Sequence, residues 1–99
     1  MKIVCYYNRN LKMSSEKLAS QIGHVCKKVG WLQEATLIGA LDDYDTIVVL
    51  GLRQNKFKEK LEEIKSTVNH NYISIQTDLG LTEVDAGTIT AFGYIKDED

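Results

Sequence analysis

Two stretches of this chain carry apolar residues at the spacing of one helix face, and this feature constrains the fold more than any other. The spacing i, i+4, i+7, i+11 gives a helix a single apolar stripe, which must pack on another layer to leave water. The two stripes are Leu18, Ile22, Val25 and Val29, and Phe57, Leu61, Ile64 and Val68. Each helix therefore requires an apolar layer that covers it.

The ends of the two helices are predicted from capping residues. Ser14 is a good N-cap for the first helix, and Glu16 is favourably placed in its first turn. We expect Gly30 to end this helix and Asn55 to cap the second one, which residues 69–71 stop. Residues 31–41 are mixed in character and leave room for a short helical turn.

Four segments have the composition of β-strands. They are rich in β-branched and aromatic residues or alternate in polarity, and they comprise residues 2–7, 44–51, 72–77 and 88–95. The second segment has a near-continuous apolar centre, which is typical of a strand covered on both faces. The order of elements predicts an α/β fold, a single compact layered domain over residues 1–99 with a four-stranded mixed sheet and helices packed on it. The residues expected to be mostly buried are Leu18, Ile22, Val25, Val29, Ile47, Val48, Val49, Phe57, Leu61, Ile64, Ile73, Ile75, Ile89 and Phe92.

Composition excludes several classes of protein. No apolar run approaches the ~20 residues that a membrane span needs, and the first residues lack the long apolar core of a signal peptide. Cys5 and Cys26 are too few for a disulfide scaffold or a zinc site made of cysteines alone. His24 and Cys26 are two positions apart and cannot share a helix face. We therefore expect a cytoplasmic protein with no metal and no cofactor.

Charge is distributed unevenly along the chain. The formal net charge is −2, but residues 1–41 carry six basic and two acidic side chains, whereas residues 42–99 carry six basic and twelve acidic ones. A mildly basic N-terminal part could face a phosphate-bearing partner. The alternative is that the charges are merely scattered over the surface.

A polar flank of the first helix is the best candidate for a binding or catalytic surface. Lys17, Gln21, His24 and Lys28 project to one side of the helix, next to the apolar stripe. A cation in the first turn opposes the helix dipole, so helix stability alone does not select Lys17, which together with the free N–H groups of the helix start could hold an anion or a developing oxyanion. The plainer alternatives are a solvated lysine with its stem on apolar surface and a structural histidine.

Asp78 and Thr88 bracket the loop between the last two strands. Polar site residues gather at strand ends in α/β sheets, which makes Asp78 a candidate. Its plainer interpretation is a turn-forming aspartate, and that of Thr88 is a β-branched residue that begins a strand. No glycine-rich phosphate loop and no nucleophile-elbow pattern are present.

Two segments resemble motifs of the archaeal and eukaryotic type of peptidyl-tRNA hydrolase. Residues 10–24, NLKMSSEKLASQIGH, resemble the family pattern DLKMGKGKxAAQxxHA, and residues 77–90, TDLGLTEVDAGTIT, resemble RDAGxTQxxPGTxT. The similarity covers roughly residues 2–95, with the motifs in the same order. The family cleaves the ester that joins a peptide to the 3′ ribose of tRNA.

The resemblance assigns roles to individual residues. The catalytic positions of the family fall on Lys17, Asp78 and Thr88, and Gln21 and His24 match polar positions on the same helix face of the family motif. We expect these two residues, with the basic Lys12 and Lys28, to bind the substrate. The resemblance implies that the protein hydrolyses peptidyl-tRNA, binds tRNA and does not associate with a membrane. Whether the protein forms a homodimer stays open at this point.

The chain departs from the family pattern where basic residues are usual. Asn8, Ser15, Thr77 and Leu81 stand at those positions, and each lost phosphate contact weakens RNA binding. Two functions follow: an esterase acting on peptidyl-tRNA, or a non-catalytic binding module of the same fold with reduced RNA affinity. An unrelated α/β domain with a small-ligand role is the third alternative.

Overall fold

The structure is a computed structural model that describes residues 2–36, 46–68, 72–78 and 87–96, with the backbone alone at residues 31–36. The described residues form four strands, two α-helices and one short 3₁₀ turn. In chain order they are β1 (Lys2–Asn8), η1 (Arg9–Leu11), α1 (Ser15–Thr36), β2 (Thr46–Leu52), α2 (Gln54–Thr67), β3 (Ile73–Thr77) and β4 (Ile89–Lys96).

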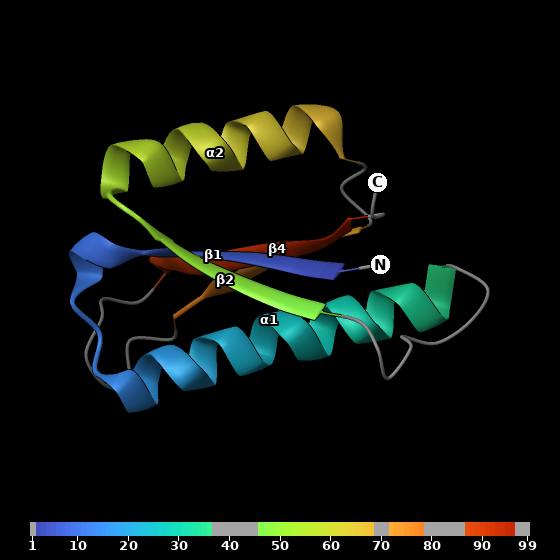
Figure 1. Ribbon diagram of the computed structural model, residues 1–99, viewed down its shortest axis with the longest axis horizontal. Helices are drawn as coiled ribbons and strands as arrows, with labels where there is room; N and C mark the ends of the chain where they lie inside the picture. The colour runs from blue at the N-terminus through green and yellow to red at the C-terminus, as the bar shows by residue number, and fades with distance from the viewer. Residues whose placement is uncertain (1, 37–45, 69–71, 79–86, 97–99) are drawn as a thin grey trace.

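The strands form one mixed sheet in the order β2-β1-β4-β3. β1 runs parallel to β2 and antiparallel to β4, and β4 runs antiparallel to β3. Figure 1 shows α2 on one face of this sheet and α1 on the other. The predicted α/β class, with a four-stranded mixed sheet and helices packed on it, is confirmed.

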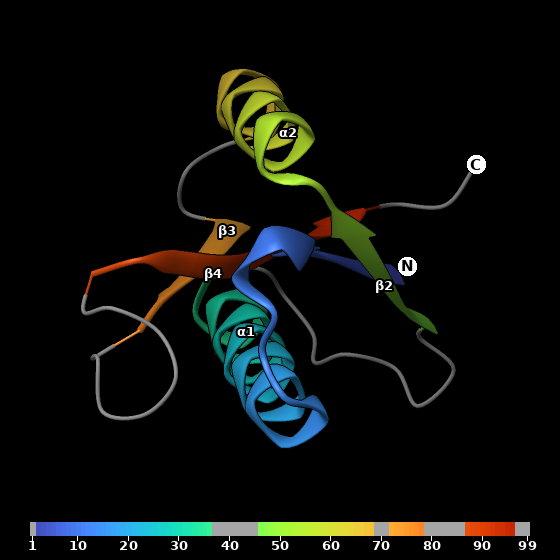
Figure 2. The same ribbon diagram turned by 90° about the vertical axis from the view of Figure 1, so that its left-hand side faces the viewer.

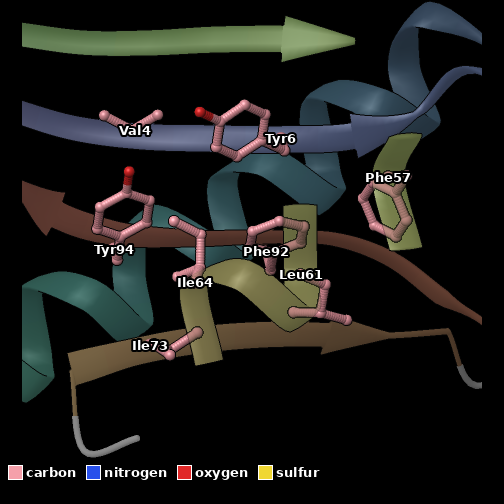
Figure 3. Close-up of a cluster of buried hydrophobic side chains, with 8 residues drawn as sticks. All are labelled: Val4, Tyr6, Phe57, Leu61, Ile64, Ile73, Phe92 and Tyr94. Atoms are coloured by element: carbon pink, nitrogen blue, oxygen red, sulfur yellow. The ribbon is translucent and has the colours of Figure 1, made fainter. Parts of the chain in front are cut away.

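Alternation along the central strands builds a separate core under each helix. Val4 and Tyr6 of β1 face α2, where they join Phe92 of β4 and the α2 residues Phe57 and Leu61 (Figure 3). The ring centroid of Phe92 lies 5.3 Å from that of Tyr6 and 5.2 Å from that of Phe57. The Tyr6–Phe92 contact joins two neighbouring strands, and the Phe57–Phe92 contact joins α2 to the sheet.

The core under α1 is smaller and tighter. It contains Ile3 and Cys5 of β1, Val25 and Val29 of α1, and Ala91 of β4. Gly93 of β4 lets the helix approach, because a Cβ atom there would lie 2.6 Å from Cγ1 of Val25. The Sγ atoms of Cys5 and Cys26 are 3.8 Å apart in this layer, and both thiols are free.

The predicted helix ends were partly wrong. Ser14 caps α1 as expected, since its Oγ accepts the N–H of Lys17 at 3.1 Å. Gly30 does not end α1, which continues to Thr36, because an interior glycine costs a helix only about 1 kcal/mol. Asn55 does not cap α2: the helix begins at Gln54, whose N–H donates to Oδ1 of Asn10 at 2.7 Å.

The prediction that the second strand is covered on both faces was wrong. β2 is an edge strand whose Ile47, Val49 and Leu50 are 54%, 42% and 44% exposed. α1 packs on β1, β3 and β4, whereas β2 lies at the edge of the sheet, to one side of α1 (Figure 2). A run of β-branched residues suits an edge strand as well as a central one, so the run itself does not reveal its place.

Burial agrees with the rest of the predicted core. The buried members are Val25, Val29, Phe57, Leu61, Ile64, Ile73 and Phe92. The partly buried members are Leu18, Ile22, Val48, Ile75 and Ile89. Neither of the described helices is long and apolar enough to cross a membrane.

Candidate active site

One rim of the sheet gathers the chain segments that the sequence analysis singled out. β1 and β3 end there, β4 begins there, and both helices begin there, as the view onto this rim in Figure 2 shows. The rim also receives Lys17 from the first turn of α1 and Asp78 from the end of β3. Positions far apart in the sequence therefore meet at one edge of the sheet.

Lys17 and Asp78 form a buried ion pair at this rim. The Nζ atom of Lys17 donates a hydrogen bond to Oδ1 of Asp78. The side chain of Lys17 is 13% exposed and that of Asp78 is 4% exposed. The carboxylate offsets the unfavourable position of a cation at a helix N-terminus, which explains why α1 tolerates a lysine in its first turn.

The backbone on both sides of the loop holds Asp78 in place beside Thr88. The N–H of Asp78 donates to the carbonyl of Thr88 at 2.9 Å, and the carbonyl of Asp78 accepts the N–H of Gly87 at 2.7 Å. Gly87 has φ +82°, a left-handed conformation that favours glycine. The structure therefore brings all three predicted catalytic residues to one rim, and it joins Thr88 to the pair through the backbone of Asp78.

A buried polar pair lies one helical turn further along α1 from Lys17. The Oγ1 of Thr90 donates to Oε1 of Gln21, and it lies 3.3 Å from the carbonyl oxygen of Gln76. Gln21 is 4% exposed and Thr90 is fully buried. The register between β3 and β4 shifts here, from Gln76 opposite Ala91 to Thr77 opposite Ile89, which leaves Thr90 as an extra residue.

Gln21 thus faces β4 and not solvent. Sequence reasoning missed Thr90 as its partner. The available signal was the Thr-Ile-Thr run, whose two threonines would lie on one face of a regular strand.

His24 and Lys28 lie further along α1, toward β3. With Lys27 and Gln76 they line a hollow of about 300 Å³. Nζ of Lys28 donates to the carbonyl of Ile75 at 3.2 Å, and the side chain of His24 is exposed. This part of the predicted polar flank is an open basic groove between helix and sheet.

Lys12 lies in a different place from His24 and Lys28. It is exposed, has left-handed backbone angles of φ 51° and ψ 43°, and lines a separate hollow of about 200 Å³ with Arg9 and Met13. A lysine in this conformation is uncommon and is found where surrounding structure fixes it. The four predicted substrate-binding residues therefore do not form one continuous patch.

The comparisons with known proteins agree with this geometry. A family model described as peptidyl-tRNA hydrolase PTH2 matches residues 1–97. No curated protein gives a significant match to the chain. Because the family model spans nearly the whole chain, the chain belongs to the peptidyl-tRNA hydrolase PTH2 family.

Proposed function

We propose that this protein hydrolyses the ester bond of peptidyl-tRNA, releasing the peptide and free tRNA. The observation that carries the proposal is the buried ion pair between Lys17 and Asp78. A buried pair of opposite charges is costly to desolvate, and replacing it with apolar side chains is often neutral or stabilising. Its presence at a rim beside Thr88 is therefore better explained by chemistry than by stability.

The proposed mechanism assigns one task to each residue. Lys17 donates to the ester carbonyl oxygen and stabilises the oxyanion that develops when water attacks the carbonyl carbon. Asp78 holds the lysine ammonium in position and orients the attacking water, and Thr88 positions the ester. The bond between the carbonyl carbon and the 3′ oxygen of the ribose then breaks. A proton from the water ends on that oxygen, which leaves a carboxylic acid and a 3′ hydroxyl.

The basic groove on α1 supports RNA as the other part of the substrate. His24, Lys27 and Lys28 follow Lys17 along the same helix, over about 16 Å from Lys17 to Lys28 at 1.5 Å per residue. Phosphates of the tRNA acceptor end would lie along these side chains when the ester reaches Lys17. Arg9 and Lys12 offer a second, separate contact.

A second candidate function is a binding module that has lost turnover. The observation that favours it is the exposure of Ser15 and Thr77, which are neutral residues where the family pattern is basic. Asn8, also neutral at such a position, is only 6% exposed and accepts the N–H of Asn10 at 3.0 Å, so it serves the turn and not the surface.

The test is the release of N-acetylated amino acid from acyl-tRNA by the wild type and two variants. Lys17→Met removes the proposed oxyanion donor and should lower the rate about 10²–10³-fold. Lys56→Met is the matched control, because it removes a lysine that is exposed on α2. A wild type without turnover at saturating substrate would support the binding module. Turnover that Lys17→Met leaves unchanged would contradict the mechanism.

The charge-restored variant Ser15→Lys/Thr77→Arg separates binding from chemistry. Under either function it should tighten RNA binding and steepen the salt dependence by about one slope unit for each phosphate that the new side chains neutralise. The cytoplasmic location and the homodimer stay predictions, which cell fractionation and analytical ultracentrifugation test.

A further inference from the structure

A cavity of about 380 Å³ opens at the same rim, on the α2 side of the sheet. Its apolar walls are Phe57 and Leu61 from α2, Ile89 from the start of β4, and Leu11 from η1. Gln54 and Lys58 of α2 are exposed and line it as well. A volume of this size falls in the range of sites that bind small molecules or side chains.

The two residues that precede β4 connect the cavity to the ion pair. Thr88 and Gly87 both line it. The same two residues hold the backbone of Asp78, through the bonds of 2.9 Å and 2.7 Å. The backbone of Asp78 is therefore bonded directly to two residues of the cavity wall.

The distribution of charge decides which part of the substrate the cavity suits. On the α1 side, the exposed Lys27 and Lys28 lie further along the helix from the rim and attract a polyanion. The cavity has four apolar walls and one lysine at its border, which suit an uncharged group and not a run of phosphates. RNA and the acyl group therefore separate onto opposite sides of the sheet.

We propose that this cavity binds the side chain of the amino acid whose carboxyl group is esterified to the tRNA, and that it favours large apolar side chains. The inference rests on the proposed function, which it deepens by naming the part of the substrate that gives selectivity. One methylene in an apolar pocket changes selectivity by about 10-fold or more. We expect a phenylalanyl group to be preferred over a glycyl group by at least that factor.

Binding of non-cleavable analogues tests the inference apart from catalysis. The probes are 3′-amino-3′-deoxyadenosines that carry N-acetylphenylalanine or N-acetylglycine in amide linkage. The wild type should bind the phenylalanyl probe at least about 10-fold more tightly. Gln54→Trp places an indole at the border of the cavity and should lower the affinity for the phenylalanyl probe to that for the glycyl probe. Lys56→Trp, two positions along α2 and outside the cavity, should keep the preference.

Equal affinity of the wild type for the two probes would overturn the inference. So would a preference that Gln54→Trp leaves intact, since the side chain would then bind elsewhere. Turnover of acyl-tRNA, measured on the same proteins, decides the proposed function separately. A preference for the phenylalanyl probe without turnover would retain the cavity as a binding site and reject hydrolysis.

Discussion

The Lys17–Asp78 pair makes an asymmetric prediction about stability. The side chain of Asp78 is 4% exposed and follows β3 directly, whereas that of Lys17 is 13% exposed and lies in the first turn of α1. Lys17→Met leaves a buried carboxylate without its lysine and should cost about 3–5 kcal/mol of unfolding free energy. Asp78→Asn leaves a lysine that can turn outward, and should cost less, about 1–3 kcal/mol.

Urea unfolding followed by far-ultraviolet circular dichroism measures these costs. The double variant Lys17→Met/Asp78→Asn completes a thermodynamic cycle and should cost less than the two single variants together, by about 1–3 kcal/mol. Lys56→Met, whose partner Glu59 is 69% exposed, should change stability by less than about 1 kcal/mol. Additive costs, or a larger cost for Asp78→Asn than for Lys17→Met, would refute the burial argument.

Three further predictions concern the layer under α1. Gly93→Ala should destabilise the protein by about 1–3 kcal/mol in thermal unfolding, because the added methyl group would meet Val25 at 2.6 Å. A second change, Val25→Ala, should reduce this penalty. Additive effects of the two changes would show that the two side chains do not clash. Ser74→Ala should be neutral or stabilising by up to about 1 kcal/mol, because the buried Oγ has no hydrogen-bond partner among the described residues; a clear loss in urea unfolding would show a missed partner. Burial, and then the neighbouring Cys26, raise the pKa of the Cys5 thiol from 9.0 to about 12. The neutral, buried Cys5 thiol therefore makes its full contribution to stability below pH 9.0, and this contribution is lost as the pH rises toward 12. Over this pH range the unfolding free energy should fall less steeply in Cys5→Ala than in the wild type.

Local patterns predicted the layers of this fold because each layer depends on short-range spacing. The stripe Phe57, Leu61 and Ile64 identified the buried face of α2, and all three residues are in the core. The place of β2 in the sheet was not predictable in this way. Ile47 and Val49 belong to an apolar run, and only the pairing of strands places that run at the edge.

The candidate site shows the same division between local and distant information. The charge of Lys17 against the helix dipole marked it as unusual, and the place of Asp78 at a strand end, together with the family resemblance, marked Asp78. Their contact spans 61 positions, which no local rule predicts. Two partners were missed for this reason. The contact of Asn10 with the start of α2 depends on a distant helix, and the contact of Thr90 with Gln21 depends on an irregular strand pairing.

The most direct test of the central claim is the single-turnover rate of N-acetylphenylalanyl-tRNA hydrolysis by the wild type and by Lys17→Met, each shown to be folded at the assay temperature. We expect the rate of the chemical step to fall about 10²–10³-fold, while the affinity for deacylated tRNA falls far less, because Lys17 acts on the transition state. An unchanged rate of the chemical step, or a loss confined to tRNA affinity, would show that Lys17 does not stabilise the oxyanion.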